Sequence, residues 1–126
     1  PQWTGGGVVF APTPRDYSFK INKKEKRAAL KSALTSRVAD NKFIVLDELK
    51  LDAIKTKDFV KVMNNLNVSK ALVVMNDSDI NVVKSAANVP GVKTTMTNTL
   101  NVYDILKYDT VVTTKAAVEA IEEVYA

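Results

Sequence analysis

The sequence predicts an α/β protein of three layers, a mainly parallel sheet with helices on both faces, preceded by a basic Gly/Pro-rich extended segment. Short apolar runs of four or five residues alternate with segments whose apolar residues recur at helical spacing. Each helix between two strands makes a crossover, so the alternation implies parallel strands. The length of 126 residues is typical of one domain. We therefore expect an extended segment over residues 1–22 and a single globular domain over residues 23–126.

Residues 1–22 lack both patterns and contain Gly5, Gly6, Gly7, Pro12 and Pro14. The prolines exclude a helix across them. Asn22 can cap the helix that follows, and Glu25 three residues later completes a start typical of a capping box. This helix is expected over residues 23 to 40. Its core-facing positions recur at helical spacing and are Leu30, Ala33, Leu34 and Val38.

The rest of the domain repeats strand and helix. Phe43–Leu46 is an apolar run ended by two acidic residues, which is typical of a buried strand. Later strands are expected at residues 71–75, 92–96 and 110–113. Asn101 is expected to cap one short helix. The helices after the first are expected at residues 56–66, 79–87, 101–106 and 115–125.

Composition excludes several kinds of chemistry. The chain has no cysteine and no histidine, so it forms no disulfide, no Cys/His zinc site and no Ser-His-Asp triad. No apolar run approaches the roughly 20 residues that span a bilayer. The first residues, PQWTGGG, lack the basic and apolar parts of a secretory signal.

Basic residues are concentrated at one end of the chain. The formal net charge is +4, but residues 1–42 hold nine basic and three acidic residues, a net charge of +6. Residues 43–126 carry a net charge of −2. This asymmetry favours a polyanionic partner, of which nucleic acid is the commonest.

Several of these basic residues form a stripe. Lys20, Lys24, Arg27 and Lys31 follow one another at spacings of four, three and four, with Lys23 beside them. The spacing places the last three on one helix face. Only Glu25 lies among them, so ion pairs within the helix do not account for so many cations. A phosphate-binding face and an ordinary solvated face are equally consistent with this pattern.

The glycine run, Gly5 to Gly7, leads into Val8-Val9-Phe10 rather than into a helix, which disfavours a phosphate-binding loop. Glycine runs usually mean flexible linkers, but linkers rarely carry aromatic residues such as Trp3 and Phe10. An aromatic-glycine segment next to Arg15 would suit contact with an RNA backbone and stacking on bases.

Acidic residues follow two of the expected strands, Asp47 after the first and Asp77 and Asp79 after the second. Carboxylates at this edge of a parallel sheet could hold Mg²⁺, as in a small α/β enzyme or receiver-like module. The more common reading of such residues is turn and helix-cap chemistry. The Mg²⁺-dependent module stays as the alternative function.

The order of residues from Trp3 to Arg15, WTGGGVVFAPTPR, resembles the signature of the bacterial large-subunit ribosomal protein four family. The similarity continues in the same order through most of the chain. It includes Lys23-Lys24, residues 29–34 (ALKSAL), Val45-Leu46-Asp47, Lys55-Thr56-Lys57, residues 101–104 (NVYD) and residues 114–119 (TKAAVE).

The resemblance implies a non-enzymatic structural protein that binds large-subunit ribosomal RNA early in assembly, without a metal or cofactor. It implies a cytoplasmic location in the ribosome, beside neighbouring large-subunit proteins and away from membranes. Some members also bind their own messenger RNA, and the sequence leaves this open. Carried over by position, Trp3, Gly5, Gly6, Gly7 and Arg15 face RNA. The charge pattern adds the basic residues Lys20, Lys23, Lys24, Arg27 and Lys31.

The family has an α/β domain with a long basic loop, and this chain resembles the family from the returning end of that loop onward. Two positions depart from the usual pattern. Thr4 stands where the family usually has arginine, which removes one phosphate contact, and Ala11 stands where glycine is frequent.

Overall fold

The computed structural model describes residues 2–125 and has a four-stranded sheet in which every pairing is parallel. The strands are β1 (Phe43–Leu46), β2 (Ala71–Met75), β3 (Val92–Met96) and β4 (Thr110–Thr114). Their order across the sheet is β1-β4-β2-β3. The expected strands are thus confirmed to within one residue.

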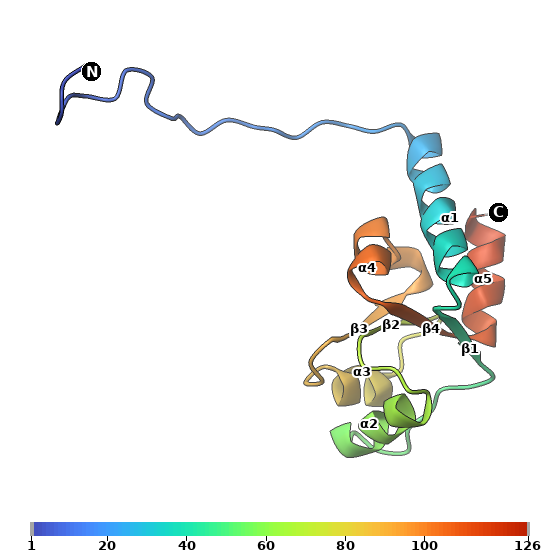
Figure 1. Cartoon of the computed structure of the whole chain (residues 1–126). Helices are drawn as coiled ribbons and strands as arrows, with labels where there is room; N and C mark the ends of the chain where they lie inside the picture. Colours follow the sequence, from blue (N-terminus) through green and yellow to red (C-terminus); the bar gives the residue numbers. More distant parts are fainter. Residues whose placement is uncertain (1, 126) are drawn as a thin grey trace.

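Helices cover both faces of this sheet (Figure 1). One face carries α1 (Lys23–Ala39), α4 (Val102–Lys107) and α5 (Lys115–Tyr125), and the other carries α2 (Thr56–Asn65) and α3 (Ile80–Ala86). The three-layer prediction is therefore confirmed. A single turn of 3₁₀ helix at Thr97–Thr99 was not expected, because three polar residues carry no periodicity to read.

The two faces of the sheet bury two separate apolar clusters. Every residue of β2 is buried, with Leu72 and Val74 packed under α1, α4 and α5. The alternate residues pack against α2 and α3, where Phe59 is fully buried. Burial on both faces explains why β2 reads as a continuous apolar run.

Hydrogen bonds stabilise the first helix at both ends. At its start, the Asn22 backbone N–H donates to Glu25 Oε2 at 3.3 Å, as the expected capping box requires. Near its end, Arg37 donates from Nε to the carbonyl of Ile105 at 3.1 Å and from Nη2 to that of Leu106 at 3.2 Å. Arg37 thereby satisfies carbonyl groups at the C-terminal end of α4. These bonds set α1 against α4.

One expectation about α1 is wrong. Leu30 and Ala33 are buried and Leu34 is half-buried, but Val38 is 56% exposed. Val38 lies in the last turn of the helix, where it borders a shallow apolar groove with Phe43 and Val118 instead of entering the core. The spacing of apolar residues correctly identified the buried face of α1. It could not show that this face is no longer covered at the last turn, where Val38 lies.

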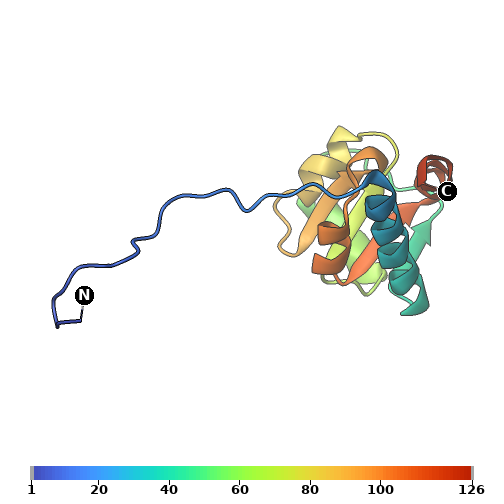
Figure 2. The same ribbon diagram turned by 90° about the horizontal axis from the view of Figure 1, so that it is seen from above.

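Residues 2–22 contain no helix or strand and run away from the globular domain (Figures 1 and 2). Every one of these side chains is exposed. We call this segment the N-terminal arm. Across residues 2–125, no helix combines the length and apolar character that crossing a bilayer requires.

Candidate nucleic-acid interface

A tight turn shapes the glycine run of the N-terminal arm. The Gly6 N–H donates to the Trp3 carbonyl at 2.9 Å, and Gly5 at the third position of the turn has φ +77°. A positive φ at this position defines a type II turn and favours glycine. Trp3 and Thr4 are the first two residues of this turn, and both are exposed.

Gly7 has a different explanation. Among the residues that the structure describes, nothing lies within 4 Å of the place where a Cβ on Gly7 would stand. Its backbone also lies outside the left-handed region, since only Gly5 and Gly91 among the described glycines have positive φ. The fold itself therefore does not require glycine here. A bare backbone at this position suits close approach to a molecule outside the chain.

The aromatic side chains of the arm are exposed and do not belong to either apolar cluster of the domain. Trp3 is 83% exposed and Phe10 is 94% exposed, and Tyr17 and Phe19 are also open to solvent. The Arg15 guanidinium carbon lies 4.3 Å from the centroid of the Tyr17 ring, a cation–π arrangement. Rings exposed to this extent are suited to stacking on bases.

A single acid interrupts this segment. The Ser18 N–H donates to Asp16 Oδ1 at 2.8 Å. Side-chain and backbone hydrogen bonds from Ser18 lower the pKa of Asp16, so this carboxylate stays ionised at neutral pH. The Asp16 carboxylate accepts a hydrogen bond within its own turn and lies in the arm, before the basic residues of α1.

The structure brings part of the expected basic set together. Lys23, Lys24, Arg27 and Lys31 are exposed on α1, whereas Lys20 lies in the arm just before it. Lys24, Arg27 and Lys31 follow one flank of the helix, and we call them the α1 stripe. None of the three ion pairs found within residues 2–125 involves the stripe. Its charges therefore remain available to a partner. The other expected residues, Trp3, Gly5, Gly6, Gly7 and Arg15, lie along the arm away from α1 (Figure 1).

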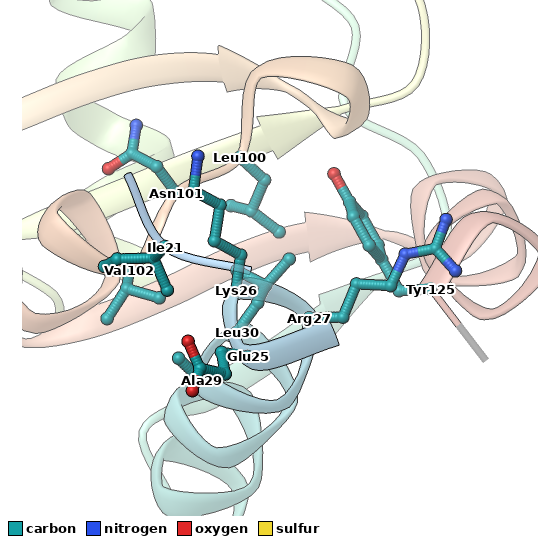
Figure 3. A pocket seen from close by; sticks show the side chains of 10 residues that line it. All are labelled: Ile21, Glu25, Lys26, Arg27, Ala29, Leu30, Leu100, Asn101, Val102 and Tyr125. Atoms are coloured by element: carbon teal, nitrogen blue, oxygen red, sulfur yellow. The ribbon is translucent and has the colours of Figure 1, made fainter. Parts of the chain in front are cut away.

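An apolar groove of about 420 Å³ lies where the arm joins the domain. Figure 3 shows Ile21 next to Val102, Lys26 directed toward Asn101, and Arg27 directed toward Tyr125. The first turns of α1, the start of α4 and the end of α5 thus meet at the root of the arm. The charge pattern did not single out Lys26, because it falls outside the stripe's spacing.

A polar cluster that sequence reasoning missed orients α4. Lys93 Nζ lies 2.8 Å from Asp104 Oδ2, and Asn101 Nδ2 donates to the same oxygen at 3.0 Å. The Asp104 N–H donates in return to Asn101 Oδ1 at 2.9 Å, which confirms Asn101 as the cap. The spacing of Asn101 and Asp104 was the available signal, but nothing in it pointed to Lys93.

The protonation states in this cluster follow from its geometry. Burial raises the pKa of Asp104, but the hydrogen bonds from Lys93 and Asn101 outweigh burial, so the net pKa is lowered. The hydrogen bond to Asp104 raises the pKa of Lys93. Both groups are therefore charged at neutral pH.

The acids after β1 and β2 take structural roles or remain in solvent. Asp79 Oδ1 accepts from the Asn81 N–H at 2.9 Å, which makes Asp79 the N-cap of α3. Asp47 and Asp77 are exposed. In the described part of the chain, no group of three or more Asp or Glu residues is placed to hold a metal ion. The geometry therefore lends no support to the Mg²⁺-dependent alternative.

Similarity to known proteins identifies the family of this chain. The profile of the ribosomal protein L4/L1 family matches residues 1–124. The large ribosomal subunit protein uL4 of Agathobacter rectalis is 79% identical over the whole chain, and those of Lachnospira eligens and Clostridium botulinum are 68% and 56% identical. The chain spans 61% of the length of each of these relatives. The profile match and these identities show that the chain belongs to the ribosomal protein L4/L1 family.

Proposed function

We propose that this protein binds large-subunit ribosomal RNA as a structural, non-catalytic constituent of the large ribosomal subunit and supports early subunit assembly. The observation that carries the proposal is the N-terminal arm, which runs away from the domain (Figure 1) and whose aromatic side chains are exposed. Exposed apolar side chains gathered in one segment are typical of a surface that binds a partner. The relatives from Agathobacter rectalis and Lachnospira eligens are both named large ribosomal subunit protein uL4, which supports a place in the large subunit.

The arm supplies contacts that suit unpaired nucleotides. Trp3 and Phe10 offer faces for stacking, and Arg15 offers a guanidinium for phosphate. The bare backbone at Gly7 allows a sugar-phosphate chain to approach without a steric clash. Such contacts place an extended segment along RNA and gain their energy only when RNA is present.

The α1 stripe supplies the electrostatic part of binding. Lys24, Arg27 and Lys31 lie along a helix that begins where the arm ends, so a strand following the arm reaches the stripe next. Contacts of lysine and arginine with phosphates release counterions and carry little sequence information. The stripe is therefore assigned a role in affinity rather than in sequence recognition.

The test is a gel shift of this chain against the 5′ portion of large-subunit ribosomal RNA. An equal length of unrelated structured RNA serves as competitor, at two salt concentrations. The proposal expects preferential binding to ribosomal RNA that persists at the higher salt. Equal and salt-sensitive binding to both RNAs would leave only a non-specific basic patch and would contradict it.

A further inference from the structure

An exposed tyrosine flanked by two lysines lies outside the residues discussed so far as RNA contacts. Tyr103 on α4 is 69% exposed. Lys107 Nζ, one turn later, lies 5.6 Å from the centroid of the Tyr103 ring and 5.6 Å from that of Tyr108. We call Tyr103, Lys107 and Lys93 the α4 platform.

The lysines of the platform differ in how they are held. Lys93 is tied to the buried carboxylate of Asp104, and its side chain is still 48% exposed. Lys107 takes part in none of the ion pairs found between residues 2 and 125. With Asp104 counted, the platform keeps one net positive charge beside an exposed ring. Cations beside an aromatic face are the combination that single-stranded RNA contacts use.

The tyrosine of the platform lies on α4, the same helix that helps to line the groove at the root of the arm. Ile21 of the arm and Val102 of α4 line the same groove, and Lys26 of α1 points across it toward Asn101 (Figure 3). Tyr103 follows Val102 directly. An RNA strand that leaves the arm at Ile21 therefore meets α4 as well as α1.

We propose that the α4 platform binds an unpaired nucleotide of the RNA, with its base stacked on Tyr103 and the flanking phosphates held by Lys107 and Lys93. This inference rests on the proposed function and adds a second, base-contacting site on the globular domain. A protein partner is the other class of occupant for an exposed aromatic. The positive charge of Lys107 beside the ring, with Lys93 nearby, is complementary to phosphate and favours RNA.

The experiment measures the affinity of three variants of the chain for the 5′ ribosomal RNA fragment. Tyr103→Ala is expected to weaken binding about tenfold, and Tyr103→Phe, which keeps the ring, less than about twofold. Leu106→Ala is the matched control, because Leu106 is an exposed apolar residue on the same helix and outside the platform. It is expected to leave affinity unchanged. Thermal unfolding of each variant shows whether α4 stays folded.

The salt dependence separates stacking from charge. Lys107→Ala is expected to reduce the slope of log affinity against log salt by about 0.7 to 0.9, the value for one phosphate contact. Tyr103→Ala is expected to lower affinity at every salt concentration and to leave that slope unchanged. Opposite behaviour of the two variants would contradict the assigned roles.

Failure of this inference can be told apart from failure of the proposed function. If the unmodified chain shows no preference for ribosomal RNA, the proposed function fails. If the chain binds preferentially and Tyr103→Ala binds as tightly as Leu106→Ala, the platform does not contact RNA and only this inference is overturned. In that case, loss of co-purification of Tyr103→Ala with large-subunit proteins would assign the platform to a protein partner.

Discussion

Removal of the α1 stripe offers the sharpest test of how the globular domain binds RNA. The change is the triple variant Lys24→Ala, Arg27→Ala and Lys31→Ala. All three side chains are exposed and take part in no ion pair found in residues 2–125, so their loss leaves no charge unpaired. Alanine is also a strong helix former, and α1 is expected to keep its fold.

The magnitude follows from counterion release. Each duplex phosphate contact contributes about 0.9 to the slope of log affinity against log salt, so three contacts contribute about 2.7. Between about 50 mM and about 200 mM salt, three contacts account for a loss of affinity of about 40-fold. The variant is expected to lose this part of the salt dependence while its unfolding free energy changes by less than about 0.5 kcal/mol.

The assay is a filter-binding or gel-shift titration against the 5′ ribosomal RNA fragment at several salt concentrations. A matched control replaces Lys57 on α2, Lys84 on α3 and Lys70 in the loop before β2, which are exposed and take part in no ion pair found in residues 2–125. Both variants lower the net charge of +4 by three. An equal decrease in slope for the control, or an unchanged slope for the stripe variant, would refute the placement of phosphates on α1.

Four further predictions follow from single residues. Phe59→Ala removes a fully buried ring and is expected to cost about 3 to 5 kcal/mol in urea unfolding. Gly91→Ala forces a side chain to φ +78° with its Cβ 3.3 Å from the Ser69 carbonyl, and thermal unfolding should show a loss of about 1 to 2 kcal/mol. Gly7→Val is expected to leave the melting temperature unchanged and to weaken RNA binding; a lowered melting temperature with intact binding would contradict this. The lowered pKa of Asp104 stabilises the fold above the ordinary carboxyl pKa, and this contribution disappears as pH falls through the lowered value. Asp104→Asn should remove that part of the acid sensitivity, as measured by unfolding between about pH 5 and pH 2.

The order and type of the elements could be predicted because apolar residues carry a clear period in this chain. Leu30 and Ala33 identified the buried face of α1, and the run from Ala71 to Met75 identified a strand buried on both sides. Strand order could not be predicted, since no residue of β4 indicates that it lies between β1 and β2. Neighbour relations within a parallel sheet depend on packing of the whole domain.

In the candidate interface, too, local relations could be predicted from the sequence and long-range contacts could not. Spacing alone placed Lys24, Arg27 and Lys31 on one helix face, since that relation is local. The pairing of Lys93 with Asp104 joins β3 to α4 across eleven residues of sequence, with the 3₁₀ turn at Thr97–Thr99 between them. The position of α4 next to Ile21 at the root of the arm depends on the same tertiary arrangement. Long-range juxtapositions of this kind leave no periodic trace in one sequence.

The place of β4 in the sheet has a consequence for how the protein is made. β4 is the last of the four strands in the chain, yet it is the one that joins β1 to β2. Within residues 2–125, β2 pairs with β3 early in synthesis, but the pairing of β1 with β4 cannot form until Thr110–Thr114 has left the ribosome. Exposed strand edges invite pairing with other chains. The edges of β1 and β2 that β4 covers in the finished sheet therefore stay open until the last strand is made.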